Sequence, residues 1–453
     1  MKKITGVVAS SVVLVALYAG ASCESEAPPL SLSASSSSTG GSDAGTGGAS
    51  EGIVSQSSAS DFETDPQIAA AEGGFLAIVW MGGRGTDATH IGYTLSADSG
   101  ASWSEPAQLV SPDGDSLSRP DVTNDRFGNF YLTYLSHRRG SEGGKVYVAK
   151  AATGATSFGA PVVVSEPDTH GIYDTPRISR TRTGMFLVAY TQIINGISSL
   201  VSATSKDAEE WTRVFVAPDD DRHRVMPYPC AARVAGSTPG RTWITHLREA
   251  RVLVRWSDDD GVTWPGEKGV DDDVQGRVAH PPTCVAQGDE IWITYGISND
   301  GQAKPSRPRR LVAIRTAYSS DGGENFELHA PVHDPEAAAY FGIPQTAIED
   351  SDAVNLIYYT GQGFNDGVGT FRRARWTLAA LAAQADAGVP DGGELGLSSA
   401  LVQSPITFAA SRESRKWVGD HVGLVFQEGK IYGSFVDNSD GYSHIRFSPL
   451  NNK

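Results

Sequence analysis

Short apolar runs recur along the chain, and each is followed by turn residues. A typical block opens with a proline and a short apolar segment at Asp65–Ile68, passes through a glycine turn, and continues as the apolar run Phe75–Trp80. Runs of this length, bounded by Gly and Pro and rich in β-branched and aromatic residues, predict β-strands. Blocks of the same design recur roughly every 50 to 60 residues, opening at Pro120, Pro176, Pro227, Pro281 and Pro344.

A second motif, S-x-D-x-G-x-x-W, repeats on the same period. It occurs at Ser257–Trp264 and Ser96–Trp103, with Phe in place of Trp at Ser319–Phe326, and a shortened copy lies at Ser205–Trp211. In such a turn the Asp carboxylate accepts hydrogen bonds from backbone N–H groups, Gly supplies a positive φ, and the aromatic side chain packs the turn onto the strands. We therefore predict hairpins that join the third and fourth strands of their blocks.

A last block lacks the proline but keeps the strands. Its apolar runs cover Gly419–Leu424, Ile431–Phe435 and Tyr442–Phe447, and we expect Gly52–Ser60 to supply a fourth strand that closes a ring. Seven blocks of about four strands predict an all-β propeller with seven four-stranded blades. A six-bladed ring with an extra hairpin is the alternative. The one helical pattern, Thr377–Gln384, falls in an insertion before the last block.

The first 23 residues have the features of a bacterial lipoprotein signal. Lys2 and Lys3 precede an apolar stretch, and Cys23 follows small residues. Lipidation of Cys23 would hold the mature chain on the cell envelope, outside the cytoplasm, and secretion is the alternative. Residues 24–55, rich in Ser, Gly and Ala, predict a flexible linker, and residues 56–453 form the predicted propeller.

Net charge, histidine spacing and cysteine positions limit the binding partners, metals and crosslinks that we expect. The formal net charge of −16 argues against nucleic acid and against an anionic membrane surface, apart from the lipid anchor. The ten histidines show no H-E-x-x-H or comparable metal spacing, so we expect no zinc site. We also expect no other metal and no cofactor, and we expect a monomer. Cys230 and Cys284 each follow a proline by three residues, and a disulfide and two separate buried thiols both fit this spacing.

With its Asp-containing turns, the segment 60–450 resembles the sialidase superfamily of β-propellers, in which such turns are called bacterial neuraminidase repeats or Asp-boxes. The resemblance implies an exo-α-sialidase-type glycoside hydrolase acting on glycans or glycoconjugates. Its chemistry would use an Asp acid/base, a Tyr nucleophile and arginines that bind the sugar carboxylate. By position, Arg84 and Asp87 match the family's arginine and acid/base, and Tyr340 and Tyr442 are candidates for the nucleophile.

The remaining family positions are matched in part. The sugar-binding arginines correspond by position to Arg248 and Arg310. Thr64 stands where the family has its first arginine, and Met226 stands where a Glu is expected. These departures favour a second function, a non-catalytic propeller lipoprotein that binds glycans or proteins.

Polar residues also stand near the starts of the first strands, which line the central mouth of a propeller. Charged side chains that converge there predict a site for a polar glycan or an ion, and polar residues that only bond channel water are the alternative. A His–Tyr–Arg cluster, such as one with His280 and either Tyr228 or Tyr173, would instead favour a polysaccharide lyase. The candidate mouth residues are Asp65, Arg119, Asp174, His280 and Asp420.

Overall fold

The computed structural model describes the chain from Glu51 to Leu450 apart from several short segments. The residues outside the description in this range are 56–60, 85–86, 112–114, 138–143, 167–170, 218–223, 233–239, 250, 272–276, 279–281, 299–310, 334–338, 350–352, 363–367, 378–398, 401–405, 408–417 and 440. The segment Gly47–Lys453 is one compact unit. Within the described residues all regular elements are β-strands. A helix long and apolar enough to cross a bilayer is therefore not found among them.

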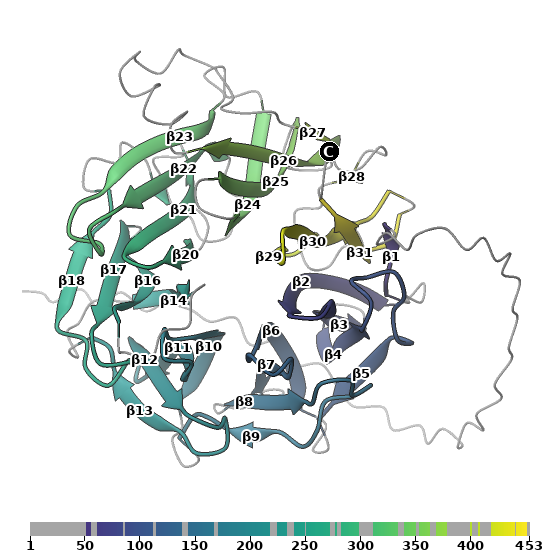
Figure 1. The fold of residues 1–453 in the computed structure, drawn as a ribbon, viewed down its shortest axis with the longest axis horizontal. Coiled ribbons are helices and arrows are strands. Elements are labelled where there is room, and N and C mark those ends of the chain that lie inside the picture. Colours follow the sequence, from purple (N-terminus) through teal and green to yellow (C-terminus); the bar gives the residue numbers. More distant parts are fainter. Residues whose placement is uncertain are drawn as a thin grey trace, which may run out of the picture. The chain divides into compact units, whose positions relative to one another are not determined.

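The strands form seven antiparallel sheets arranged as blades around a centre (Figure 1). Blade 1 contains β2 (Asp61–Ala71), β3 (Phe75–Arg84), β4 (Asp87–Ser96) and β5 (Ala107–Val110). Blade 2 contains β6 (Ser116–Asn124), β7 (Phe130–His137), β8 (Gly144–Ala151) and β9 (Val162–Val163). Blade 3 contains β10 (Ile172–Arg180), β11 (Phe186–Ile194), β12 (Ile197–Ser205) and β13 (Thr212–Phe215).

The next two blades follow the same order, with two additional short strands. Blade 4 contains β14 (Arg224–Pro229), β16 (Thr242–Arg248), β17 (Arg251–Ser257) and β18 (Gly266–Gly269). Blade 5 contains β20 (Thr283–Gln287), β21 (Glu290–Ser298), β22 (Leu311–Ser319) and β23 (Glu327–His333). Two short strands also pair with blade 5, β15 (Ala231–Ala232) on β20 and β19 (Arg277–Val278) on β21.

The last two blades complete the ring. Blade 6 contains β24 (Ala339–Ile348), β25 (Ala353–Gln362), β26 (Val368–Thr377) and β27 (Ser399–Ala400), with β28 (Ile406–Thr407) also paired to β26. Blade 7 contains β29 (Gly423–Gln427), β30 (Lys430–Asp437), β31 (His444–Pro449) and β1 (Gly52–Ile53). The seven-bladed prediction is confirmed. The predicted helix begins at Thr377, the last residue of β26, and its other residues lie outside the description.

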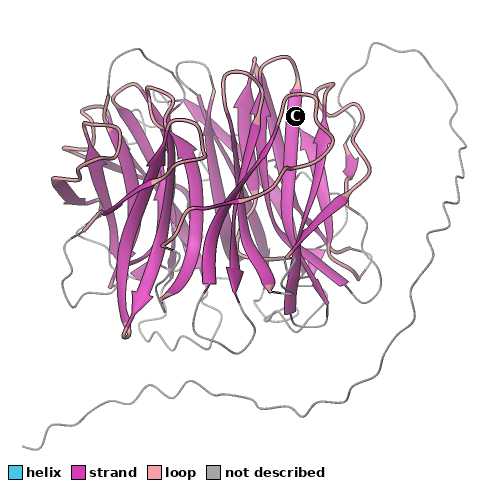
Figure 2. Cartoon of the chain, turned by 90° about the horizontal axis from the view of Figure 1, so that it is seen from below, coloured by secondary structure: helices cyan, strands magenta, loops and turns pink. Residues whose placement is uncertain are grey.

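The ring closes by pairing the two ends of the described chain. β1 runs antiparallel to β31, with Gly52 opposite Phe447, and Val54 donates its N–H to the carbonyl of Ile445 at 2.9 Å. The predicted fourth strand of the last block is therefore supplied from Gly52–Ile53. In Figure 1 the first strand of each blade lies nearest the centre, and in Figure 2 the strands run between two loop-bearing faces.

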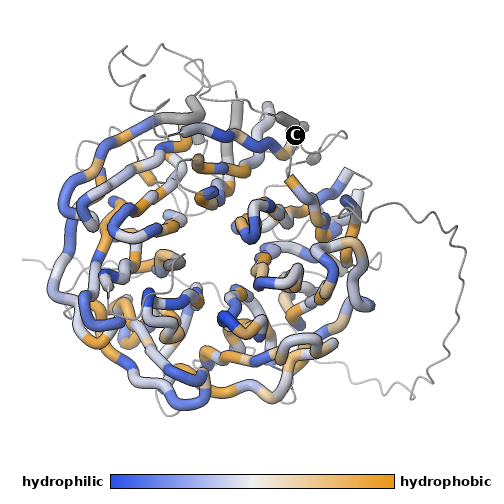
Figure 3. The backbone as a smooth tube through the Cα atoms, in the orientation of Figure 1, coloured by the Kyte–Doolittle hydropathy of each residue, from blue (hydrophilic) through white to orange (hydrophobic). Residues whose placement is uncertain are grey.

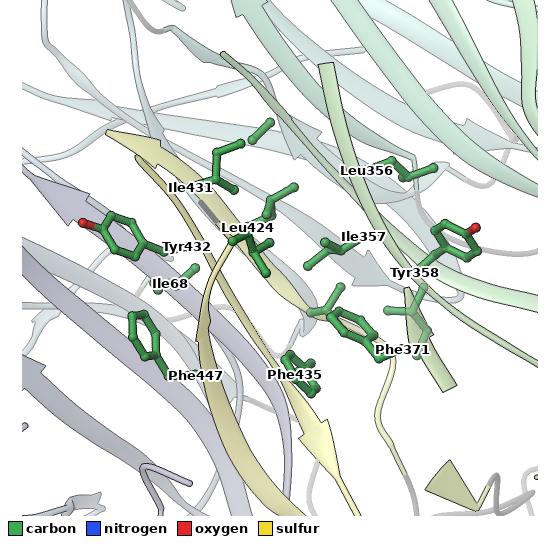
Figure 4. Close-up of a cluster of buried hydrophobic side chains, with 14 of the residues drawn as sticks. Ile68, Leu356, Ile357, Tyr358, Phe371, Leu424, Ile431, Tyr432, Phe435 and Phe447 are labelled. Carbon is green, nitrogen blue, oxygen red and sulfur yellow. The ribbon is translucent and has the colours of Figure 1, made fainter. Parts of the chain in front are cut away.

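Apolar side chains fill the spaces between neighbouring blades. Figure 4 shows the cluster between blades 6, 7 and 1, where Phe371 stacks on Phe435 with ring centroids 4.1 Å apart. Trp80, Trp243 and Trp292 lie on the second strands of their blades and are almost fully buried in the core. Hydrophilic and hydrophobic residues are both found on the strands around the centre (Figure 3), which leaves polar groups available at the axis.

The Ser-x-Asp turns join third to fourth strands, as predicted. In blade 4 the Ser257 hydroxyl donates to Asp259 at 2.7 Å, and the same carboxylate accepts the N–H of Thr263 at 2.8 Å. The Trp264 Nε1–H reaches back to the Ser202 hydroxyl on blade 3 at 3.0 Å. Each such turn therefore orders its own hairpin, and this one also fastens its blade to the preceding blade.

Every first strand that begins with the proline motif and is fully described contains a β-bulge at that proline. The residue before the proline has a positive φ of 48° to 58° in each case, although L-residues other than Gly rarely adopt this conformation. Proline has no N–H to offer a neighbouring strand, which makes it suited to a bulge. The five residues are Asp65, Arg119, Thr175, Met226 and Ile343.

Cys230 and Cys284 form a disulfide, which settles the alternative that the spacing left open. Their Cα atoms lie 4.7 Å apart, and the bond joins the end of β14 in blade 4 to β20 in blade 5. Directly after Cys230 the chain forms β15, which runs parallel to β20. The disulfide therefore fixes the place where the chain passes from one blade to the next.

Candidate functional site

Four of the polar residues predicted at the mouth lie together, three aspartates around Arg119. Its Nη1 is 3.0 Å from Asp420 Oδ2, and its Nε is 3.6 Å from Asp174 Oδ1. Asp65 is near enough to act on Arg119 electrostatically. We call Asp65, Arg119, Asp174 and Asp420 the mouth cluster. Its members come from blades 1, 2, 3 and 7, so only the closed ring brings them together.

Asp65 connects the two ends of the ring at the mouth. Its buried carboxylate Oδ1 accepts the backbone N–H groups of Asp420 at 2.5 Å and His421 at 3.1 Å. The neighbouring Gly419 has a φ of +86°, and a Cβ there would overlap Thr64 Oγ1 and lie 2.5 Å from Asp65 Oδ1. Only glycine allows this approach, which holds the Asp420 carboxylate toward Arg119.

The electrostatics of the mouth cluster keep Arg119 charged. Burial alone would lower the pKa of Arg119, but the negative charges of Asp420, Asp174 and Asp65 outweigh it and raise the pKa above its usual value. Asp174 and Asp420 keep 45% and 39% of their side-chain surface exposed. A ligand can therefore reach carboxylate oxygens that accept hydroxyl hydrogen bonds, beside a guanidinium that donates.

Two candidates from the family resemblance lie at the same end of the ring. Arg84 and Asp87 face each other across the β3–β4 hairpin, and Arg84 is also opposite Asp61, the first residue of β2. Arg84 is exposed and Asp87 is half-buried. Tyr340 stands near the start of β24, opposite Gly361, and therefore also at this end of its blade.

Arg248 is directed away from the mouth. Its Nη1 donates to Glu267 Oε1 at 2.5 Å, and Arg255 Nε donates to Oε2 of the same carboxylate at 2.9 Å. Glu267 lies on β18, the outermost strand of blade 4. Although burial alone would raise the pKa of Glu267, Arg255 and Arg248 lower it. The Arg248 guanidinium is thus held in an ion-pair network on the outer part of the blade.

The other candidates lie where their side chains or their whole residues are not described. His280, Arg310 and Cys23 are outside the described residues. Sequence reasoning did not predict a further polar layer, which lies along the axis beyond the bulges and is built on Asp121, Arg177, Tyr228 and Gln345. Of these four, Tyr228 alone was a candidate, and for a different cluster, with His280. The layer's only sequence signal is position: in each block these residues follow the bulge proline by one residue.

Comparison with known proteins shows a shared fold without close sequence similarity. The sequence matches no known family model and no curated protein sequence. A phage phi92 endosialidase structure is 9% identical, with a TM-score of 0.51 over 88% of this chain and 68% of that chain. A protein of unknown function from Dyadobacter fermentans is 13% identical, with a TM-score of 0.46 over 88% of this chain and 97% of that chain.

A third solved structure is also similar to the chain. It is a Trypanosoma rangeli sialidase in complex with the inhibitor DANA, 12% identical, with a TM-score of 0.40 over 87% of this chain and 55% of that chain. At these identities the likeness shows the fold alone. The chain is a seven-bladed β-propeller, and its fold is sialidase-like.

Proposed function

We propose that the chain acts on glycans at the mouth of the propeller, as a glycoside hydrolase of the extracytoplasmic envelope. The observation that supports this most directly is the mouth cluster, in which four blades bring three carboxylates and one guanidinium to a single partly exposed place. Carboxylates that accept sugar hydroxyls and exchange protons are the groups that most glycosidases use.

The ion pairs that Arg119 and Arg248 already form affect whether a neutral or an anionic glycan can bind. Arg119 already interacts with three aspartates, and Arg248 already pairs with Glu267. An anionic sugar would have to compete with these carboxylates for either guanidinium, whereas a neutral sugar would accept and donate hydrogen bonds without displacing them. This arrangement favours neutral glycans over sialic acids as ligands of the mouth cluster.

Sialidase-type hydrolysis remains the more specific version of the proposal. In that version Asp87 acts as the acid/base beside Arg84, Tyr340 is the nucleophile, and Arg310 binds the substrate carboxylate without Arg248, which pairs with Glu267. A non-catalytic propeller that binds glycans or proteins is the second candidate function. It is favoured by Thr64 and Met226, which replace residues of the sialidase pattern, and by the pairing of Arg248.

One set of assays separates these functions. We would measure fluorophore release from a panel of neutral glycosides and from a sialic-acid glycoside, using the wild type, Asp87→Ala and Asp174→Asn, with exposed Glu209→Gln as the control. Loss of neutral-glycoside turnover in Asp174→Asn alone supports the mouth cluster, and turnover of the sialoside that Asp87→Ala abolishes supports the sialidase version. No turnover of any glycoside, with glycan-array binding intact, would leave the non-catalytic function.

The location is part of the proposal. The Cys230–Cys284 disulfide fits an oxidising compartment, and the Cys23 motif supplies a lipid anchor. We expect the wild type in the membrane fraction of bacterial cells and Cys23→Ala in the soluble extracytoplasmic fraction, as a monomer. Equal amounts of both proteins in the soluble fraction would contradict the anchor.

A further inference from the structure

Four polar side chains form a layer across the channel on the far side of the bulges from the mouth cluster. Arg177 Nη1 lies 3.7 Å from Asp121 Oδ1, and the Arg177 guanidinium stands 5.7 Å from the ring centre of Tyr228. Gln345 Nε2 donates to the Tyr228 hydroxyl at 2.9 Å. We call Asp121, Arg177, Tyr228 and Gln345 the channel layer. It connects blades 2, 3, 4 and 6.

A cavity of about 400 Å³ adjoins the channel layer. The first strands of all seven blades line it, and its volume lies within the range of about 300–1,000 Å³ that is common for small-molecule sites. Tyr228, Gln345 and Asp121 form a polar part of its wall. Val285 and Val425 contribute an apolar part from blades 5 and 7. The wall therefore offers both hydrogen-bonding and apolar groups to a ligand.

The charged side chains of the channel layer offset one another. Asp121 is the only carboxylate in the layer, and Arg177 lies beside it as the only cation. At the far end of the cavity, the Asp125 carboxylate already accepts hydrogen bonds from Tyr131 at 2.9 Å and from Asn129 at 2.7 Å, so it stabilises its own turn. Arg180 there donates to the carbonyl of Gly184 at 3.2 Å. Glu72 and Arg126, one residue of each sign, also line the cavity. Because both signs are present, the lining favours neither a cation nor an anion, and the polar wall suits an uncharged ligand.

Several polar groups at the cavity retain hydrogen-bonding capacity. Tyr228 accepts from Gln345, so its own proton is left to donate, and burial together with the Asp121 charge raises the pKa of Tyr228 to about 12, which keeps that proton in place at neutral pH. The Ser179 hydroxyl is 2% exposed and has no hydrogen-bond partner among the described residues. The Arg177 Nη1 atom, which lies behind the wall, also has no hydrogen-bond partner among the described residues.

We propose that this cavity binds one neutral monosaccharide. Its hydroxyl groups would bond Tyr228, Gln345 and Asp121, while its C–H face would pack against Val285 and Val425. A pyranose offers this combination of hydroxyl edge and apolar face, and an anionic sugar would place its charge beside the buried Asp121 carboxylate. The site is separate from the mouth cluster, so the inference goes beyond the proposed function and does not require hydrolysis.

Titration calorimetry tests the inference directly. The full mature chain would be titrated with D-glucose, D-galactose and D-mannose, and with N-acetylneuraminic acid as the anionic comparison. We expect one binding site for at least one neutral sugar and no binding of the anionic sugar at this site. In Tyr228→Phe the dissociation constant should rise at least tenfold, because the hydroxyl that donates to the ligand is gone.

Two further variants separate this site from the mouth and from a folding defect. Asp174→Asn, in the mouth cluster, should bind the neutral sugar as the wild type does. Val285→Phe keeps the channel layer but fills part of the cavity, so it should lose binding while its melting temperature stays near that of the wild type. Absence of binding by the wild type, or binding that Asp174→Asn abolishes and Tyr228→Phe and Val285→Phe preserve, would overturn the inference.

Discussion

At the scale of the residue, the geometry of the mouth depends on backbone conformations that few side chains tolerate. Asp65 and Arg119 both adopt positive φ at a bulge, and each directs its side chain into the mouth cluster. Strain of this kind costs on the order of 1–3 kcal/mol per residue and persists only where surrounding contacts fix it. For Asp65 these contacts are the hydrogen bonds that its carboxylate accepts from the backbone N–H groups of Asp420 and His421. For Arg119 the contact is its ion pair with Asp420.

Gly419 allows a specific prediction about this contact. Gly419→Ala should destabilise the chain by about 3 kcal/mol, because it combines a strained φ with overlap against Thr64 and Asp65. Gly429→Ala is the matched control, since its φ is +74° but nothing lies within 4 Å of the added Cβ, and it should cost only about 1 kcal/mol. Urea unfolding measures both values. Equal losses would mean that the approach to Asp65 does not matter.

At the scale of the element, the Ser-x-Asp turns carry local electrostatic stabilisation. The backbone N–H and side chain of Asn325 and the hydroxyl of Ser319 bond the Asp321 carboxylate and lower its pKa to about 2. The ordinary Asp value is about 3.9. Because the folded pKa is the lower one, this stabilisation is fully present above about pH 4 and is lost as the pH falls toward 2.

The acid sensitivity of this turn can be measured. Asp321→Asn should have lower stability than the wild type at neutral pH and a smaller loss of stability between about pH 5 and pH 2, since the titrating carboxylate is gone. The unfolding midpoint in urea, recorded across this pH range, checks both statements. Glu209→Gln, an exposed change on the Ser205–Trp211 turn of blade 3, should follow the wild-type profile. Parallel profiles for wild type and Asp321→Asn would contradict the role of the turn.

The disulfide acts between elements rather than within one. It closes a loop whose ends are 54 positions apart and joins blades 4 and 5 near the axis. The loop-closure entropy of such a loop corresponds to about 4 kcal/mol. We therefore expect Cys284→Ser and Cys230→Ser to be destabilised by similar amounts in thermal unfolding, and reduction of the wild type to have the same effect. A reduced wild type as stable as the oxidised protein would show that the blades need no crosslink.

At the scale of the whole molecule, the closed ring brings residues from different sequence blocks together in one site. The block pattern predicted the seven blades, the closing strand and the Ser-x-Asp turns because each depends on local periodicity or turn chemistry. The mouth residues Asp65, Arg119, Asp174 and Asp420 could be chosen from their place near the first-strand starts.

What the sequence did not predict depends on side-chain direction. Arg248 lies at the mouth end of β16 by position, yet its side chain reaches Glu267 on the outer strand. Glu267 lies 19 residues after Arg248 in the chain. No local sequence pattern indicates whether the Arg248 side chain points to the mouth or to Glu267. The bulges escaped prediction for a similar reason: the prolines marked the sites, but the register shift appears only when the neighbouring strand is in place.

The most direct test of the account is a crystal structure of the mature chain with a neutral glycan selected on an array. We predict ligand density within hydrogen-bonding distance of the carboxylates of Asp174 and Asp420, at the end of the ring where the first strands begin. Glycan density confined to the outer strands, for example beside Glu267, would contradict the claim that the ring gathers its function at the mouth.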